Sequence, residues 1–143
     1  MTALTRERRA SLLARAPRED LEPLAEHVLA AAATEPVVLS GPDIGMVMMQ
    51  VREPVATERF YLGEVLVTQA EVELAGHRGW CMRLGDDRRA TLAAAVLDAA
   101  AEGEARDSVD ALCHQVARTQ DEAESAEWAE IAPTEVKFEE LDS

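Results

Sequence analysis

The first 36 residues show the spacing of amphipathic helices. Residues Thr5 to Ala16 predict a short helix that ends at Pro17, because proline does not continue a helix. A second helix is predicted to begin with Asp20 as its N-cap and to end before Pro36. Its apolar side chains recur at three- and four-residue spacings at Leu21, Leu24, Ala25, Val28 and Ala32. Two N-terminal helices are therefore expected.

Between residues 37 and 84 the period changes from helical to alternating. Val37–Leu39 is a short strand candidate, and Ser40-Gly41-Pro42 after it is typical of a turn. Ile44–Val51 alternates as a strand does, and Phe60–Leu62 leads past Gly63 into a further strand over Val65–Leu74. Together with a returning strand, these segments predict an antiparallel sheet of about four strands.

The returning strand has two distinct faces. Gly76 fits a hairpin turn, after which Trp80, Met82 and Leu84 alternate. Since successive side chains of a strand point to opposite faces, Cys81 and Arg83 lie on the other side.

The last part of the chain returns to helical spacing. Gly85-Asp86 is predicted to cap a helix over Asp87–Glu102, which Gly103 ends. A second helix is predicted from about Asp107, with an apolar stripe that fades past Thr119. Residues 133–143 are predicted to be an extended tail. Residues 1–143 therefore predict a single α+β domain, with helices on either side of the sheet in the sequence.

Composition and charge narrow the partners. Aromatic residues are only 3% of the chain, so the core must consist of Ala, Leu and Val. The net charge is −14, with five Arg and one Glu in residues 1–18 but 13 acids and three bases in residues 102–143. Nucleic-acid binding is disfavoured because it needs clustered Lys and Arg. An acidic surface is also an ordinary means of staying soluble.

The location follows from what the sequence lacks. No stretch approaches the roughly 18 consecutive apolar residues of a membrane span. The Arg-containing N-terminus is not followed by the apolar segment of a secretory signal. Cys81 and Cys113 lie far apart without a pairing motif, which is typical of reduced thiols. A cytoplasmic protein with no membrane contact is expected.

No metal site is predicted. The imidazole and thiol groups are dispersed at His27, His77, Cys81, Cys113 and His114. Structural zinc sites usually need pairs at spacings such as C-x₂₋₄-C, and two thiols alone cannot hold an iron–sulfur cluster. No serine lies in a G-x-S-x-G context, and both cysteines are expected to be unreactive core thiols.

Phosphate binding has four candidate residues near the sheet and the helix after it: Arg59, Arg83, Arg88 and Arg89. Guanidinium groups bind phosphate bidentately, and a helix N-terminus favours anions. The alternative is that Arg88 and Arg89 pair with Asp86, Asp87 and nearby acids. No glycine-rich nucleotide loop is present. By residue chemistry alone, this is an α+β domain without a recognisable active site.

Several ordered segments match the pattern of one known family. They are a glycine-containing strand ending in arginine, an E-R-F-[FY]-x-G-[DE] signature, a T-x-A-x-V strand, a G-[YW] strand with a G-x-D turn, and a T-x-V-x-F element. These occur at Asp43–Arg52, Glu58–Glu64, Thr68–Val72, Gly79-Trp80 with Gly85–Asp87, and Thr134–Phe138. In this order they resemble the PhnG family, the G subunit of the carbon–phosphorus lyase core complex. The chain departs from that pattern after Phe138, where Glu139-Glu140-Leu141 stands in place of a second Phe followed by Thr, Met and a basic residue.

The resemblance implies a supporting subunit with no activity of its own. It implies work with the H, I and L proteins, which join an alkylphosphonate to the ribose of ATP, release adenine and give ribose 1-methylphosphonate 5-triphosphate. It also implies packing against the H, I and J subunits in a two-fold symmetric hetero-oligomer. ATP would be a substrate of the complex, and the iron–sulfur cluster and S-adenosylmethionine would belong to the J subunit alone.

Two other interpretations remain open. One is a stand-alone acidic adaptor without an enzymatic role. The other is a free-standing enzyme whose site assembles from scattered Arg and Glu.

Overall fold

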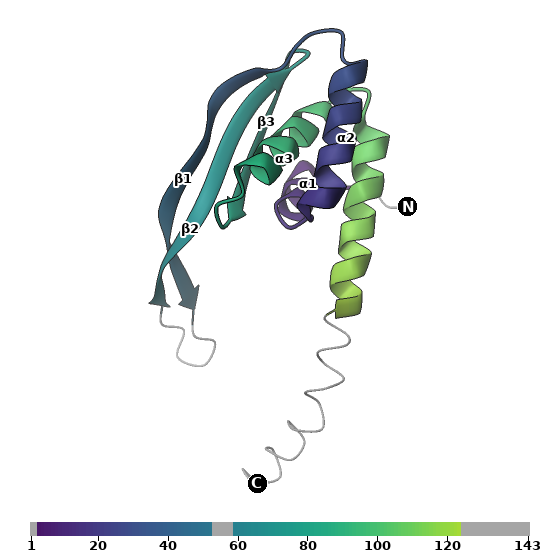
Figure 1. Cartoon of the computed structure of the whole chain (residues 1–143). Coiled ribbons are helices and arrows are strands. Elements are labelled where there is room, and N and C mark those ends of the chain that lie inside the picture. Colours follow the sequence, from purple (N-terminus) through teal and green to yellow (C-terminus); the bar gives the residue numbers. More distant parts are fainter. Residues whose placement is uncertain (1–2, 53–58, 124–143) are drawn as a thin grey trace.

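The computed structural model of the chain describes residues 3–52 and 59–123. Its elements are α1 (Arg6–Leu13), α2 (Arg18–Ala31), β1 (Val37–Arg52), β2 (Arg59–Leu74), β3 (His77–Leu84), α3 (Arg88–Ala100) and a last helix over residues 106–123. The strands form one antiparallel sheet, and the helices gather on one side of it (Figure 1). The predicted α+β class is confirmed. The predicted extended tail, 133–143, lies outside the described residues.

The described sheet has three strands in the order β1-β2-β3, so the expectation of about four is wrong. Ser40-Gly41-Pro42 is not a turn, because β1 continues through it with register shifts against β2 on both sides of Ser40. Gly41 accommodates this bulge with a φ of 76°. Phe60–Leu62 likewise belongs to the same strand as Val65–Leu74. Turn-forming residues therefore produced irregularity within long strands.

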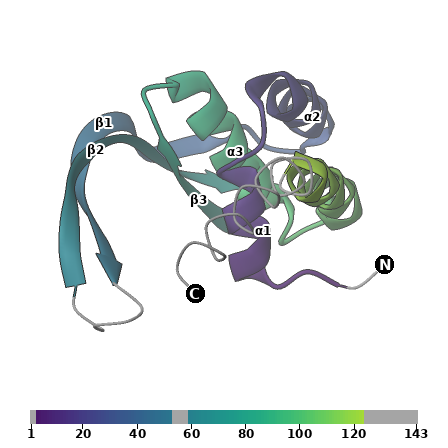
Figure 2. The ribbon, with the colours of Figure 1, turned by 90° about the horizontal axis from the view of Figure 1, so that it is seen from below.

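The β1–β2 hairpin is much longer than β3. Its paired region begins at Val37 with Glu73 and ends at Arg52 with Arg59. Seen from below, the far part of this hairpin extends away from the helices (Figure 2). The helices therefore cover only the part of the sheet that includes β3.

The helix starts differ from those predicted in two cases. The N-cap of α2 is Pro17, and Asp20 lies in the first turn instead. The N-cap of α3 is Asp87, whose side chain accepts a hydrogen bond from Ala90 N at 3.0 Å, so Gly85-Asp86 is not the cap. Asp20 and Asp87 both lie at a helix N-terminus, where negative charge is favoured.

The core is centred on α3, which packs against β2, β3 and α2. Almost every residue of α3 is buried, and most of these are alanines. Gly79 of β3 allows the closest approach, because a Cβ at this position would overlap the backbone of Ala95 and the Ala99 residue. The expected core of small side chains is therefore present, and it brings α3 directly onto the sheet.

Candidate functional site

Two of the four candidate arginines are held by partners within the chain. Arg83 extends from β3 toward the end of α1, where its Nη1 donates to the Leu13 carbonyl at 2.8 Å. Arg89 forms a two-pronged pair with Glu22 of α2, with Nε 3.1 Å from Oε1 and Nη2 3.2 Å from Oε2. Arg83 therefore joins α1 to the sheet, and Arg89 joins α3 to α2.

The structure gives no partner within the described residues for Arg88, one of the other two arginines. Arg88 is the exposed first residue of α3, next to Asp87. Because the Asp87 carboxylate caps this helix and lies 3.5 Å from Arg18 Nη1, a negative group already occupies the helix N-terminus. Arg59 begins β2 opposite Arg52, and its side chain lies outside what the structure describes. Phosphate binding by these arginines stays a prediction.

A buried ion pair that the sequence did not indicate joins α1 to the last helix. Arg9 is 3% exposed, and its Nε lies 2.8 Å from Asp110 Oδ1. Glu102 also lies beside Arg9, with Oε1 3.8 Å from Arg9 Nη1. The only sequence signal is the contrast between a basic N-terminus and an acidic C-terminal third. Since the partners are about a hundred residues apart in sequence, only the fold could pair them.

Asp98 of α3 is a second buried charge, and it fixes the edge of the sheet. Its side chain is 5% exposed, and Oδ2 accepts from Trp80 N at 2.9 Å and from Arg6 Nη2 at 3.2 Å. Arg6 also donates to the Arg78 carbonyl. Two backbone groups on the outer edge of β3 are therefore bonded to side chains from the helical layer.

Both thiols have surroundings that disfavour the thiolate. Burial raises the pKa of Cys81 to about 12, although the guanidinium of Arg83 opposes this change. Burial, together with the nearby Asp110 carboxylate, raises the pKa of Cys113 to about 11. A nucleophilic cysteine needs a lowered pKa, so neither thiol is suited to catalysis at neutral pH.

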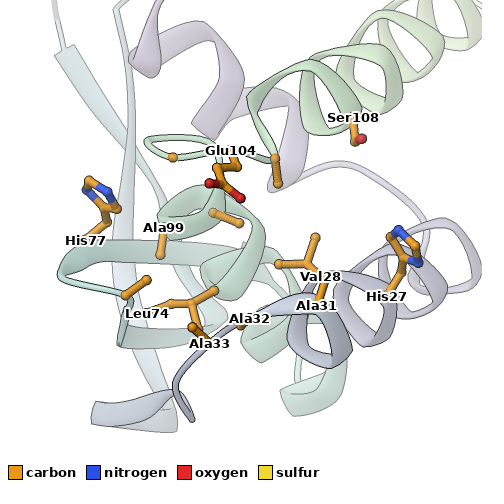
Figure 3. A pocket seen from close by; sticks show the side chains of 14 residues that line it. His27, Val28, Ala31, Ala32, Ala33, Leu74, His77, Ala99, Glu104 and Ser108 are labelled. Atoms are coloured by element: carbon orange, nitrogen blue, oxygen red, sulfur yellow. The ribbon is translucent and has the colours of Figure 1, made fainter.

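A cavity of about 500 Å³ opens between the ends of α2 and α3 (Figure 3). Its lining is largely small and apolar, and its polar side chains are His27, His77, Glu104 and Ser108. The two imidazoles come from opposite sides of the cavity, one from α2 and one from the start of β3. No hydrogen bond joins Ser108 to either imidazole within the described residues. This arrangement accommodates an apolar group but lacks a nucleophile beside a base.

Neither a metal cluster nor a membrane helix is found in the described part of the chain. Across residues 3–52 and 59–123, no three His, Cys, Asp or Glu side chains come together in a way that could hold a metal ion. In those same two stretches, no helix has the length and apolar character needed to cross a bilayer. The absence of a metal from the whole chain stays a prediction.

Comparison with known proteins shows which family has a similar sequence. A family model described as "Phosphonate metabolism protein PhnG" matches residues 4–142. A protein of Rhizobium meliloti (strain 1021) is 37% identical to the chain over 100 residues, which are 68% of this chain and 64% of that protein. The relative is named "Alpha-D-ribose 1-methylphosphonate 5-triphosphate synthase subunit PhnG". The chain thus matches somewhat less than two thirds of the length of this relative.

Proposed function

The chain belongs to the PhnG family of phosphonate metabolism proteins, and we propose that it is a supporting subunit of a ribose 1-methylphosphonate 5-triphosphate synthase within a carbon–phosphorus lyase complex. The observation that carries this proposal is the family match over residues 4–142. The name of the relative from Rhizobium meliloti supports the same assignment.

The described side chains favour a supporting role over a catalytic one. Arg83 and Arg89 are engaged by Leu13 and Glu22, and the cysteines are buried with raised pKa values. Half of the residues that line the cavity between α2 and α3 are alanines. An isolated chain with this arrangement is expected to show no turnover.

The proposed partners follow from the family resemblance. The chain would pack with the H, I and J subunits in a two-fold symmetric assembly and act together with the L protein. That assembly would transfer the ribose triphosphate of ATP to an alkylphosphonate and release adenine. The chain itself would carry no cofactor, and the iron–sulfur cluster and S-adenosylmethionine would remain with the J subunit.

Reconstitution tests this proposal. The chain is co-expressed with relatives of the H, I and J subunits, and the products are separated by gel filtration at low and moderate salt. We expect one complex containing all four proteins. With the L protein, ATP and methylphosphonate, this complex should release adenine, while the chain alone should not. If the chain fails to co-elute at both the low and the moderate salt concentration, the proposal is overturned.

The acidic-adaptor alternative makes a different prediction for the same assay. If the chain is only an adaptor, omitting it leaves the rate of adenine release unchanged. If it is a required subunit, omitting it removes the activity even when H, I and J are present at the same concentrations. A free-standing enzyme would instead release adenine without any partner.

Arg59 is the residue to test for contact with substrate, because it lies in the segment Glu58-Arg59-Phe60 that most closely resembles the family signature. If Arg59 pairs with a carboxylate at a subunit interface, Arg59→Ala should weaken assembly, since removing one partner of a buried pair typically costs about 3–5 kcal/mol. If it contacts the triphosphate, assembly should persist while the concentration of ATP needed for half-maximal rate rises. Arg118→Ala, which removes an exposed arginine of the last helix that is not among the phosphate-binding candidates, is the control. Unchanged assembly and unchanged ATP dependence in Arg59→Ala would remove both roles.

A further inference from the structure

The sheet has an outer face that the helices do not cover (Figure 1). The strand register and the burial pattern define it, because paired residues of antiparallel strands share a face. Trp80, Met82 and Leu84 of β3 lie on this face and are 45%, 37% and 69% exposed. Cys81 between them is buried against the helices. We call the surface formed by Trp80, Met82 and Leu84 the β3 outer face.

Trp80 is held in a fixed position although half of its side chain is exposed. Trp80 lies opposite Glu71 of β2 in the strand register, and the Trp80 backbone N–H donates to the buried Asp98 carboxylate at 2.9 Å. The chain has only two tryptophans, and exposing one on a rigid strand leaves a large apolar area in contact with water. Tryptophan is among the residues that contribute most at protein interfaces, and a rigid anchor loses little conformational entropy on binding.

The edge of β3 is not open to a further strand near Trp80. The Arg78 carbonyl accepts from Arg6, and the Trp80 N–H donates to Asp98. An added strand needs these backbone groups for its own hydrogen bonds. A partner therefore contacts the β3 outer face through side chains and does not extend the sheet.

The charge beside this apolar surface defines the partner. Glu71 and Glu73 of β2 lie on the same face, next to Trp80 and Arg78 in the register, and Arg78 Nη1 lies 4.0 Å from Glu71 Oε1. Asp43 of β1 also lies there and accepts from Gln69 at 3.3 Å. Since the chain carries a net charge of −14, a second copy would bring carboxylates against carboxylates. A partner with Lys or Arg bordering an apolar patch matches this surface.

We infer that the β3 outer face is the docking surface for a neighbouring subunit of the assembly, and that this subunit presents an apolar patch bordered by Lys or Arg. The inference rests on the proposed function, because it assigns a contact surface for the assembly proposed there. Trp80 is the central anchor, Met82 and Leu84 extend the apolar contact, and Glu71 with Glu73 meets the basic border.

Binding of surface variants to relatives of the H, I and J subunits tests the inference. The variant Trp80→Thr/Met82→Thr/Leu84→Thr should no longer co-elute, with a Kd at least about tenfold higher than that of the unmodified chain. The matched control is Met46→Thr/Met48→Thr, which removes side chains of 54% and 56% exposure from the opposite face of the sheet. This control should bind normally.

Charge reversal provides a second, independent set of variants. Glu71→Lys/Glu73→Lys should weaken the complex several-fold at low salt and less at high salt, because salt screens the interaction. Glu19→Lys/Glu26→Lys makes the same change of charge on exposed positions of α2 and should bind normally. Circular dichroism and urea unfolding check every variant. If the triple variant unfolds, Leu84→Thr alone and the charge pair decide the result.

Each outcome has a distinct meaning. If the unmodified chain binds and the β3 variants bind equally well, the inference is overturned and the proposed function stands. If the unmodified chain does not bind, the proposed function is overturned together with the inference. If light scattering shows that the isolated chain forms a dimer that Trp80→Thr dissociates, the surface belongs to a second copy and the inference is overturned.

Discussion

The two faces of β3 differ in the size and polarity of their side chains, and it is not the larger, more apolar set that is buried. The face toward the helices has Gly79, Cys81 and Arg83, and the face toward solvent has Trp80, Met82 and Leu84. Alternation therefore separates a smaller, more polar set from a larger, more apolar set. The smaller set forms the buried side.

The reason for this difference is the close approach of α3. Its alanines bring the helix backbone against β3, which leaves no room for large side chains on that face. Arg83 is accommodated because its guanidinium reaches beyond the helix to the Leu13 carbonyl. The distance between two packed elements, and not hydrophobicity alone, therefore determines which face of a strand enters the core.

Gly79→Ala is expected to have the largest effect on this packing. Its Cβ would overlap the Ala95 carbonyl and the Ala99 residue, so α3 has to move away from the sheet. We expect the free energy of unfolding to fall by about 3 kcal/mol or more, as measured by urea denaturation. Gly45→Ala is the control, because a Cβ at Gly45 has open space around it. Equal stability of both variants would contradict the proposed role of close packing.

Asp98→Ala tests the connection between the helical layer and the edge of β3. It leaves the Trp80 N–H and the Arg6 guanidinium without their carboxylate partner. We expect a loss of roughly 2–3 kcal/mol in unfolding free energy, since a buried donor without a partner is costly. Asp43→Ala removes a carboxylate from the outer face and should change stability by less than about 0.5 kcal/mol. If both variants lose a comparable amount of unfolding free energy, the helix-facing carboxylate is no more important for stability than the one on the outer face.

The buried thiols predict an alkaline loss of stability. Because the pKa values of Cys81 and Cys113 are raised to about 12 and about 11, the folded chain keeps these protons at a pH where the unfolded chain, with thiol values near 9.0, releases them. The contribution of the two protonated thiols to the free energy of unfolding is complete below about pH 9 and is lost as the pH rises toward 11 and 12. The loss is up to roughly 1.4 kcal/mol per thiol for each pH unit.

Urea unfolding at pH 8, 9 and 10 measures this dependence. The variant Cys81→Ala/Cys113→Ala is the control, since it retains the other groups that titrate in alkali. Its stability should decrease less steeply above pH 9. The same slope in both proteins would show that the thiols do not contribute.

Leu84→Thr should have the smallest effect. Leu84 is 69% exposed on the β3 outer face, and threonine has a high tendency to occupy strands. We expect the unfolding free energy of the isolated chain to change by less than about 0.5 kcal/mol. A loss above about 1.5 kcal/mol would mean that this face is part of the core of the isolated chain.

Local patterns predicted most of the elements in the described chain. The 3.6-residue spacing placed the helices, and the alternation on residues 80–84 separated Trp80 from Cys81 correctly. These predictions succeeded because each depends on neighbours within a few residues. The ordered motifs also indicated the PhnG family, which the match over residues 4–142 confirms.

The tertiary structure decided what depends on distant partners. It joined Ser40-Gly41-Pro42 into β1 as a bulge, because pairing with β2 continues on both sides of these residues. It also chose the helix-facing side of β3 and paired Arg9 with Asp110 and Arg89 with Glu22, across 101 and 67 positions of sequence. Periodicity shows that a strand has two faces, and composition shows that the chain contains arginines and many carboxylates. Neither shows which element packs on a given face or which carboxylate pairs with a given arginine, because both depend on contacts formed only when the chain folds.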